Sequence, residues 1–325
     1  MKRSNNLVLY IITGLLLGSC STYPHKQNQQ TQEPIFKNNK FITSDGSALP
    51  YAMWGPRIDP SVIIVGMHSF GDFSKTYELI GKYFAKQKIA VWTYDQRGFG
   101  DSPNRGIWAG TETLVQDMRQ FATLVQQEAG NNIPMVFLGE SMGAAVILAA
   151  LGNDNLDIKP KSIILSGPAV RENRPYRYLF NIGLWGITRI IPGKEAKIAR
   201  TFDKQLDPFH AERWASDLRI IDSVRLDTYY GLIRLSDYAS EKAKELRVPT
   251  LVLFGTDDSQ IHPKSICALM SALNSESKLQ VYDKNPHLMF QVKNQEDILL
   301  DISAWVIQQE YLDKHPKTAL CNHTK

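Results

Sequence analysis

The stretch Gly139-Glu140-Ser141-Met142-Gly143 reads G-x-S-x-G, and its flanks give this short pattern its meaning. An apolar run of strand length, residues 133–138, precedes it, and a run of good helix formers, residues 144–151, follows it. This order predicts a strand, a sharp turn and a helix. The two glycines fit the turn, because side chains two residues on either side of a strained serine would collide.

Such a turn is a nucleophile elbow, which would lift the hydroxyl of Ser141 out of the sheet. It would also place the N–H of Met142 at a helix N-terminus, where a developing oxyanion is stabilised. G-x-S-x-G also occurs by chance, so the alternative is a plain Gly/Ser turn that enters a helix. The rest of the chain has to decide between the two.

The length and composition are those of a globular protein. A chain of 325 residues can form one large α/β domain with an insertion, or two ordinary domains. Hydrophobic residues at 43% and charged residues at 22% are typical of soluble globular proteins. The formal charge of +4 is small, and loss of Lys2 and Arg3 would lower it to +2. No basic run with interleaved aromatic residues occurs, so nucleic acid is not an expected partner.

The first twenty residues have the features of a targeting segment. Lys2 and Arg3 precede an apolar run, residues 7–17, which is too short to span a membrane as a helix. The run ends in Leu17-Gly18-Ser19-Cys20, which resembles a bacterial lipobox. The resemblance implies that residues 1–19 are a lipoprotein signal peptide and that Cys20 becomes the lipidated (palmitate-bearing) N-terminus. An ordinary secretory signal with a chance cysteine and an uncleaved anchor are the alternatives.

The lipobox resemblance also implies a location and a tether. The protein would be anchored to a membrane of the bacterial cell envelope through its N-terminal lipid. Ser21 stands where some lipoproteins carry Asp, which by resemblance favours the outer membrane over the inner one. Residues 20–40 are rich in Gln, Asn, Thr and Lys, and we expect a flexible tether there.

Strand-like and helix-like segments alternate along the rest of the chain. Their order predicts an α/β protein with a mostly parallel sheet covered by helices on both faces. The alternation stops once, between residues 167 and 247. The expected strands are residues 41–43, 49–54, 61–67, 90–94, 133–138, 162–166, 249–254 and 279–282. The expected helices are residues 73–87, 111–128 with Thr111 as cap, 144–151, 263–273 and 295–311.

Three strand ends carry residues that could act together. A serine hydroxyl needs a base to become a nucleophile, and the base needs an orienting carboxylate. Ser141 follows one expected strand, Asp257 and Asp258 follow a second, and His287 follows a third. The order serine, acid, histidine is the chain order of an α/β-hydrolase triad.

Two motifs together carry a resemblance to a known family. The elbow, with residues 95–102 (Asp-Gln-Arg-Gly-Phe-Gly-Asp-Ser), resembles the monoacylglycerol-lipase-like, or serine aminopeptidase-type, branch of the α/β-hydrolases. Phe99 stands where this branch frequently has His. The resemblance covers about Phe41 to Tyr311 and implies the α/β-hydrolase fold. The implied parts are a core from residues 41–166 and 248–313, a helical cap from 167–247, and a polar tail from 314–325.

The resemblance also assigns roles to residues. It implies Ser141 as nucleophile, His287 as base and Asp258 as the acid, with Asp257 as the alternative acid. His68-Ser69-Phe70-Gly71 takes the place of the family's H-G-x-G loop, so the N–H groups of Met142 and Phe70 are the expected oxyanion donors. Ser69 departs from the family's glycine. We expect His68 to be structural, because the base should follow the acid in the chain.

Several other residues allow two interpretations. Aromatic and aliphatic residues between 176 and 191 favour core packing between cap and core, and the alternative is a mobile apolar lid that touches a membrane or acyl chains. For Glu140 we favour a surface salt bridge over a role in orienting the lid or binding substrate. Cys267 and Cys321 could pair in an oxidising compartment or remain separate thiols. No C-x-x-C or His/Cys cluster predicts a metal site, and no cofactor is expected.

The sequence therefore predicts a lipid-anchored serine hydrolase that cleaves carboxylic esters of acyl chains. Its type would be a monoacylglycerol lipase, a lysophospholipase or a carboxylesterase. Peptidase, amidase and thioesterase activity on the same triad are alternatives, because one fold serves many reactions. A further alternative is a non-catalytic envelope lipoprotein that uses the scaffold for binding. The sequence does not specify the acyl length, the head group or the oligomeric state.

Overall fold

The computed structural model describes residues 30–152, 159–172, 175–198, 203–274, 276–308 and 320–321. The expected signal peptide, Cys20, and most of the expected tether and polar tail lie outside these residues. Among the helices described, none combines the length and the apolar character needed to cross a membrane.

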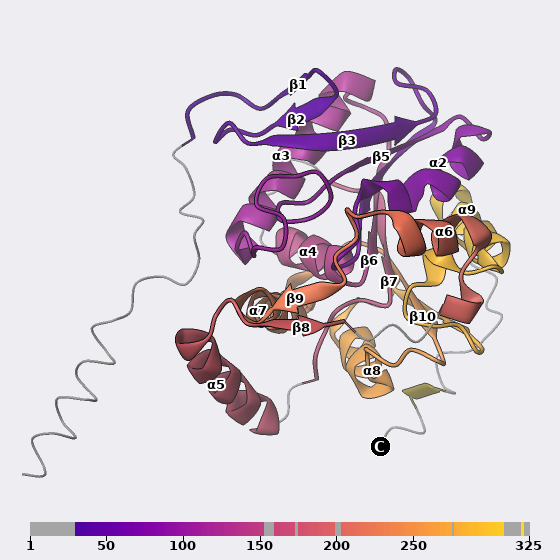
Figure 1. Cartoon of the computed structure of the whole chain (residues 1–325). Helices are drawn as coiled ribbons and strands as arrows, with labels where there is room; N and C mark the ends of the chain where they lie inside the picture. The colour runs from indigo at the N-terminus through magenta and orange to yellow at the C-terminus, as the bar shows by residue number, and fades with distance from the viewer. Residues whose placement is uncertain are drawn as a thin grey trace, which may run out of the picture.

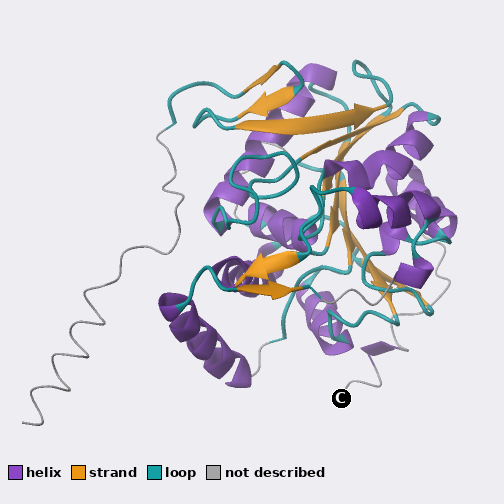
Figure 2. Ribbon diagram, viewed as in Figure 1, coloured by secondary structure: helices purple, strands orange, loops and turns teal. Residues whose placement is uncertain are grey.

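A nine-stranded sheet runs through the molecule in the order β1-β2-β3-β5-β4-β6-β7-β10-β11 (Figures 1 and 2). The first strands pair antiparallel, and the strands from β5 to β11 pair parallel. Together with the helices on its faces, this sheet confirms the predicted α/β-hydrolase fold. The strands are β1 (Ile35–Lys37), β2 (Lys40–Ile42), β3 (Ala48–Trp54), β4 (Val62–Met67), β5 (Ile89–Tyr94), β6 (Met135–Glu140), β7 (Ser162–Ser166), β10 (Thr250–Gly255) and β11 (Lys278–Tyr282).

The central strands are apolar throughout because both faces of the sheet are buried. In β4, Ile63, Val65 and Met67 face one hydrophobic cluster, and the alternate residues Val62 and Ile64 face another. The same alternation occurs in β6 and β10. Every residue of these three strands is buried, which explains the nearly continuous β-branched and aliphatic runs in the sequence.

Two sets of helices cover the two faces. The buried residues of α3 (Thr111–Ala129), α4 (Met142–Leu151) and α8 (Pro263–Ala272) pack on one face. Those of α2 (Glu78–Ala85) and α9 (Gln295–Gln308) pack on the other. Short 3-10 turns precede α2 (η1, Ser74–Tyr77) and α9 (η4, Met289–Gln291).

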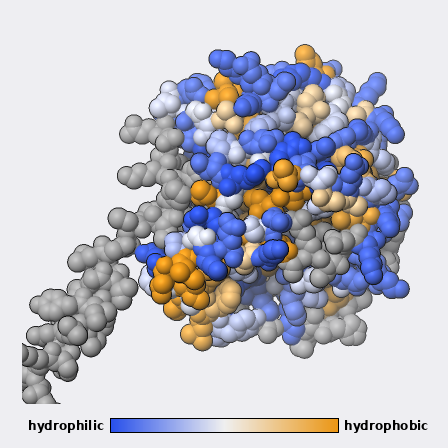
Figure 3. Space-filling view, in the orientation of Figure 1, coloured by the Kyte–Doolittle hydropathy of each residue, from blue (hydrophilic) through white to orange (hydrophobic). Residues whose placement is uncertain are grey.

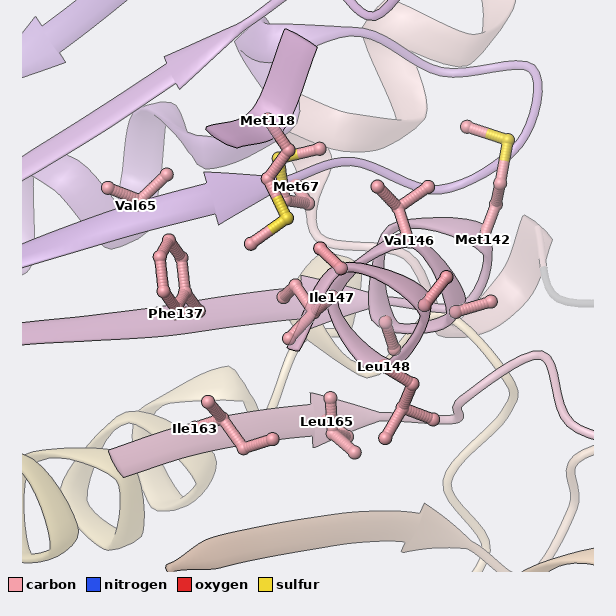
Figure 4. Close-up of a cluster of buried hydrophobic side chains, with 14 of the residues drawn as sticks. Val65, Met67, Met118, Phe137, Met142, Val146, Ile147, Leu148, Ile163 and Leu165 are labelled. Atoms are coloured by element: carbon pink, nitrogen blue, oxygen red, sulfur yellow. The ribbon is translucent and has the colours of Figure 1, made fainter. Parts of the chain in front are cut away.

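Helix α4, which follows the G-x-S-x-G turn, is almost wholly buried. Ile147 lies beside β6, the strand that carries Phe137, and Leu148 lies on the side of Leu165 of β7 (Figure 4). A helix that is apolar all round has to be covered on all sides. α4 is covered by the sheet, by α3 and by α7 (Leu226–Lys242).

The N-terminal part of the fold begins earlier than the sequence analysis predicted. The expected tether to residue 40 is too long, since β1 (Ile35–Lys37) pairs antiparallel with β2. Phe36 anchors this strand: its ring lies 5.5 Å from that of Trp92 and 4.7 Å from that of Tyr51. The expected cap of α3 is also displaced by one residue, because Gly110 is the N-cap and Thr111 is the first helical residue.

The interruption in the alternation forms a separate layer over one end of the sheet. It comprises α5 (Pro175–Ile190), β8 (Glu195–Lys197), η2 (Asp203–Gln205), α6 (Pro208–Ser216), β9 (Ser223–Arg225), α7 and η3 (Ala243–Glu245). β8 and β9 pair antiparallel into a small sheet of their own. We call the described residues between β7 and β10 the cap.

Helix α5 corrects the favoured interpretation of the aromatic and aliphatic residues between 176 and 191. Most of them do not pack into a core: Leu179 is 73% exposed, and Ile190 is 77% exposed. Of the α5 side chains, only Arg177, Leu184 and Thr188 are buried. α5 projects from the body of the molecule and packs mainly against α7 (Figure 1). Its exposed apolar surface is visible as an orange patch in Figure 3.

A disulfide links Cys267 of α8 to Cys321, which settles the pairing that the sequence left open. The bridge joins residues 54 positions apart. It fastens the chain end to the helix that follows the loop of Asp258.

Candidate active site

Ser141 occupies a strained turn between β6 and α4. Its φ of 53° and ψ of −111° lie where side-chain-bearing residues are rare. Neighbouring backbone leaves no room for side chains at the flanking glycines. A Cβ on Gly143 would lie 2.0 Å from the carbonyl oxygen of Met67, and one on Gly139 would lie 2.6 Å from the nitrogen of Ala144. The turn has the geometry of a nucleophile elbow.

Ser141, His287 and Asp258 form one hydrogen-bonded chain. Nε2 of His287 lies 2.8 Å from Oγ of Ser141, and Nδ1 lies 2.7 Å from Oδ2 of Asp258. All three side chains are buried or nearly so. A neutral imidazole that donates from Nδ1 to the carboxylate can accept a hydroxyl proton at Nε2. The arrangement can therefore activate a serine for attack on a carbonyl carbon.

The structure distinguishes between the two candidate carboxylates. Asp258 accepts from His287 through Oδ2, and through Oδ1 from the N–H groups of Gln260 and Ile261. These bonds fix the carboxylate in one orientation. Asp257 is exposed, and its backbone N–H donates to the carbonyl of Asn285, while its carboxylate has no hydrogen bond to the residues that the structure describes. The geometry thus places Asp258, not Asp257, beside the histidine.

The two residues expected to supply oxyanion donors border Ser141. Met142 is the first residue of α4, and the first N–H groups of a helix lack intrahelical partners. Phe70, in the loop after β4, lines a cavity that also contains Ser141 and His287. The positive end of the α4 dipole adds to the stabilisation of negative charge at this point.

Two cavities meet at Ser141, between the sheet and the cap. One has a volume of about 370 Å³ and a mainly apolar lining, which includes Trp214, Ile221, Val224 and Leu288. The other has a volume of about 600 Å³, and Arg171, Glu172 and Arg177 are among its lining residues. Ser141 therefore lies where one apolar and one more polar part of a small molecule could both be accommodated.

His68 and His262, two other histidines of this region, have structural contacts instead. His68 is buried, and its Nε2 accepts from the N–H of Gln96 at 2.9 Å, so Nδ1 carries the proton and donates to the carbonyl of Ser69. Burial lowers the pKa of His68, in keeping with a neutral ring. His262 is exposed and caps α8 through a hydrogen bond from the N–H of Lys264.

Glu140 was expected in a surface salt bridge, and that expectation is wrong. Its side chain is fully buried beneath the elbow. Oε1 accepts from the N–H of Phe290 at 3.1 Å, and Nε2 of Gln291 lies 3.4 Å from Oε2. Because β6 is covered on both faces, a side chain at its last position faces the interior.

Two further features of the site did not follow from the sequence. Gly167, just after β7, has a φ of 47°, and a Cβ there would lie 3.1 Å from Nδ1 of His287. Gly167 could have been proposed as a site residue from the sequence, because it directly follows an expected strand. The second feature is a buried ion pair between Asp72 and Arg213. No local pattern could have shown it, because the partners are 141 residues apart.

These features define a serine hydrolase of the α/β-hydrolase superfamily. Residues 58–294 match the family model described as serine aminopeptidase, S33, and the chain belongs to this family.

The chain resembles several known proteins over most of its length. It is 23% identical over 273 residues to the monoacylglycerol lipase of Mycolicibacterium smegmatis. That match covers 83% of this chain and 96% of the relative. A soluble variant of the monoglyceride lipase from Saccharomyces cerevisiae, solved with a substrate analogue, has a TM-score of 0.70. The match covers 90% of this chain and 100% of that one, at 18% identity. A carboxyl esterase from Bacillus coagulans, solved with glycerol, has a TM-score of 0.67 at 17% identity, covering 84% of this chain and 98% of that one.

Proposed function

We propose that this protein is a lipid-anchored serine hydrolase that cleaves carboxylic esters of acyl chains. Monoacylglycerols, lysophospholipids and simple carboxylic esters are the candidate substrates. The observation that carries the proposal is the hydrogen-bonded chain from Ser141 through His287 to Asp258, at the junction of two cavities. The names of the relatives, which are monoacylglycerol lipases and esterases, support the ester over other acyl compounds.

The proposed reaction has two stages. Oγ of Ser141 attacks the ester carbonyl while Nε2 of His287 takes its proton, and Asp258 stabilises the imidazolium that forms. The N–H groups of Met142 and Phe70 hold the negative charge on the carbonyl oxygen. His287 then gives its proton to the departing alcohol. Water, activated by the same histidine, hydrolyses the acyl-enzyme and regenerates Ser141.

The apolar cavity is proposed as the acyl site and the more polar cavity as the site of the alcohol. Binding of an acyl chain is favourable there, because its apolar surface leaves water and contacts Trp214, Val224 and Leu288. Arg171 and Glu172 offer charged and hydrogen-bonding groups to a leaving group that carries hydroxyls. This division would hold the ester carbonyl at Ser141, where the two cavities meet.

The proposed membrane location has two sources of support. The lipobox-like sequence at Cys20 predicts an anchor, and α5 exposes Leu179, Ile182 and Ile190. α5 carries aromatic residues and the exposed Arg189, and it contains no acidic residue. That composition is typical of a helix that lies in the surface of a membrane. The Cys267–Cys321 disulfide is in keeping with a compartment outside the reducing cytosol.

A series of p-nitrophenyl esters from acetate to palmitate tests the proposal, using protein that begins at Ser21. We expect turnover, with the highest kcat/KM for medium or long chains. Val224→Trp should narrow the apolar cavity and shift the optimum to shorter chains. Leu218→Trp, on the exposed surface of the cap, is the matched control and should leave the optimum unchanged.

The outcomes of this series separate the alternatives. Activity on amides or thioesters that exceeds activity on esters would favour the peptidase, amidase or thioesterase alternatives. Absence of turnover together with failure of Ser141 to react with a fluorophosphonate probe would favour a non-catalytic scaffold.

A further inference from the structure

A buried ion pair joins the cap to the loop that carries Phe70. Nη1 and Nη2 of Arg213, on α6, donate to Oδ1 and Oδ2 of Asp72, each at 2.9 Å. The side chain of Arg213 is 3% exposed and that of Asp72 is 0% exposed. Burial by itself would raise the pKa of Asp72, but the charge of Arg213 and its hydrogen bonds hold that pKa below its usual value. The pair is thus an ionised, two-bond contact between cap and core.

Two further contacts hold the same loop against the same part of the cap. The backbone N–H of Ile221 donates to the carbonyl oxygen of Gly71 at 2.8 Å. The guanidinium carbon of Arg213 lies 5.3 Å from the centre of the Phe73 ring. Residues on both sides of Asp72 are therefore held by the cap, and the loop conformation depends on where α6 lies.

The ion pair also reaches the segment that follows His287. Nε2 of Gln291 donates to Oδ2 of Asp72 at 2.9 Å, and Oε1 of Gln291 accepts from Nε1 of Trp214, on α6, at 2.6 Å. The N–H of Asp207, the N-cap of α6, donates to the carbonyl oxygen of Gln291 at 2.8 Å. α6 thus binds two loops that approach Ser141 from different strands.

Other titratable groups at this place do not replace Arg213 as the partner of Asp72. His210, also on α6, is buried, and its pKa is lowered to about 3 by burial and by the charge of Arg213. His68 is neutral for the reason given above. Burial, with the nearby charge of Asp72 adding to it, raises the pKa of Glu140 to about 8, which favours the protonated form and weakens any competition with Asp72 for Arg213.

We propose that Arg213 is a positioning residue for the reaction. Through Asp72 and Gln291 it holds the Phe70 loop and the His287 segment in fixed positions relative to each other. The inference rests on the proposed function, because it assigns Phe70 to the oxyanion hole. α6 is then a fixed part of the catalytic framework, not a lid, and Arg213 affects the chemical step more than the binding of the acyl chain.

The test compares kcat and KM for p-nitrophenyl acetate and p-nitrophenyl decanoate. For Arg213→Gln we expect kcat to fall about 100-fold on both esters, with KM changed less than about threefold, because a displaced oxyanion donor weakens transition-state binding. Arg213→Lys keeps the charge and should recover part of the loss. Arg225→Met is the matched control: it removes another bidentate Arg–Asp pair of the cap, with Asp227 at 3.0 and 2.7 Å, and should leave kcat unchanged.

A second variant keeps the test decisive if Arg213→Gln does not fold. Asp72→Asn/Arg213→Met removes both buried charges together, a change that proteins often tolerate. This variant should fold and still show a kcat lowered about 100-fold. Wild-type kcat in the folded double variant, or a loss confined to KM for decanoate, would overturn the proposal. If the wild-type protein hydrolyses neither ester, the proposed function itself is contradicted, and the role proposed for Arg213 is contradicted as well.

Discussion

Oε1 of Glu140 accepts a hydrogen bond from the backbone N–H of Phe290 at 3.1 Å, so the residue before Ser141 is joined to the segment after His287. The contact bridges 150 positions of sequence. Glu140 is buried among Tyr77, Asp72 and Gln291. The protonation state of the Glu140 carboxyl group therefore affects how the loop of Ser141 and the segment after His287 are aligned.

The pH dependence of stability should report on Glu140. In the folded protein its pKa is raised to about 8, mainly by burial, from an ordinary value of 4.5. Between these pH values the folded state keeps a proton that the unfolded chain releases. The contribution of Glu140 to stability therefore falls as pH rises through this window, by at most about 1.4 kcal/mol per pH unit. Glu140→Gln cannot titrate, so it should become progressively more stable than wild type from pH 5 to pH 8.

Urea unfolding at pH 5, 6.5 and 8 measures this difference. Glu245→Gln, at an exposed residue that pairs with Lys242, is the control. A stability difference between Glu140→Gln and wild type that stays constant over this range would show that Glu140 has an ordinary pKa.

Gly167→Ala should impair catalysis more than it impairs folding. A Cβ at this position would lie 3.0 Å from the carbonyl oxygen and 3.1 Å from Nδ1 of His287. Displacement of the ring from Ser141 should lower kcat about 10- to 100-fold. Gly46→Ala serves as the control for backbone strain, since its φ of 83° is also positive but no atom lies within 4 Å of the added Cβ. Equal kcat values for the two variants would mean that the contact with His287 does not matter.

Helix α5 should contribute to membrane binding independently of the lipid anchor. Leu179→Ser/Ile182→Ser, made in protein that begins at Ser21, removes two exposed apolar side chains from α5. Binding to vesicles that contain anionic lipid should fall about 10-fold or more, because each side chain adds apolar area to the contact. Hydrolysis of soluble p-nitrophenyl acetate checks that the variant folds.

The matched control for α5 is Ile58→Ser/Leu218→Ser, which alters two exposed apolar residues elsewhere. It should bind vesicles as wild type does. If both double variants bind equally well, α5 is not the membrane-binding surface.

The disulfide should stabilise the fold without taking part in the reaction. Cys267→Ala should lower the free energy of unfolding by about 2–4 kcal/mol, mainly because the unfolded chain gains freedom. Cys321→Ala should give a similar loss, and the double variant should lose no more than either single one. Losses that add up in the double variant would indicate that each cysteine acts through separate contacts.

The fold, and the meeting of Ser141, Asp258 and His287 at one place, could be predicted because their signals are local. Ser141, Asp258 and His287 each follow an apolar strand, and strand ends in a parallel sheet converge. β1 was missed because three residues in a polar stretch carry little pattern, and its stability comes from the stacking of Phe36 on distant rings.

Other features depend on packing that no local pattern reveals. The apolar residues of α5 predict a helix equally well whether they face a core or a membrane. The contacts of Arg213 with Asp72 and of Glu140 with Phe290 join residues more than a hundred positions apart. The first pair depends on how the cap lies on the core, and the second on how β6 and the segment after β11 pack together within the core.

Ser141→Ala asks whether Ser141 is the nucleophile of an ester hydrolase. Hydrolysis of a medium-chain p-nitrophenyl ester should fall by at least about 1,000-fold, while the far-UV circular dichroism and the melting temperature stay those of the folded protein. Undiminished ester hydrolysis by folded Ser141→Ala protein would show that Ser141 is not the nucleophile.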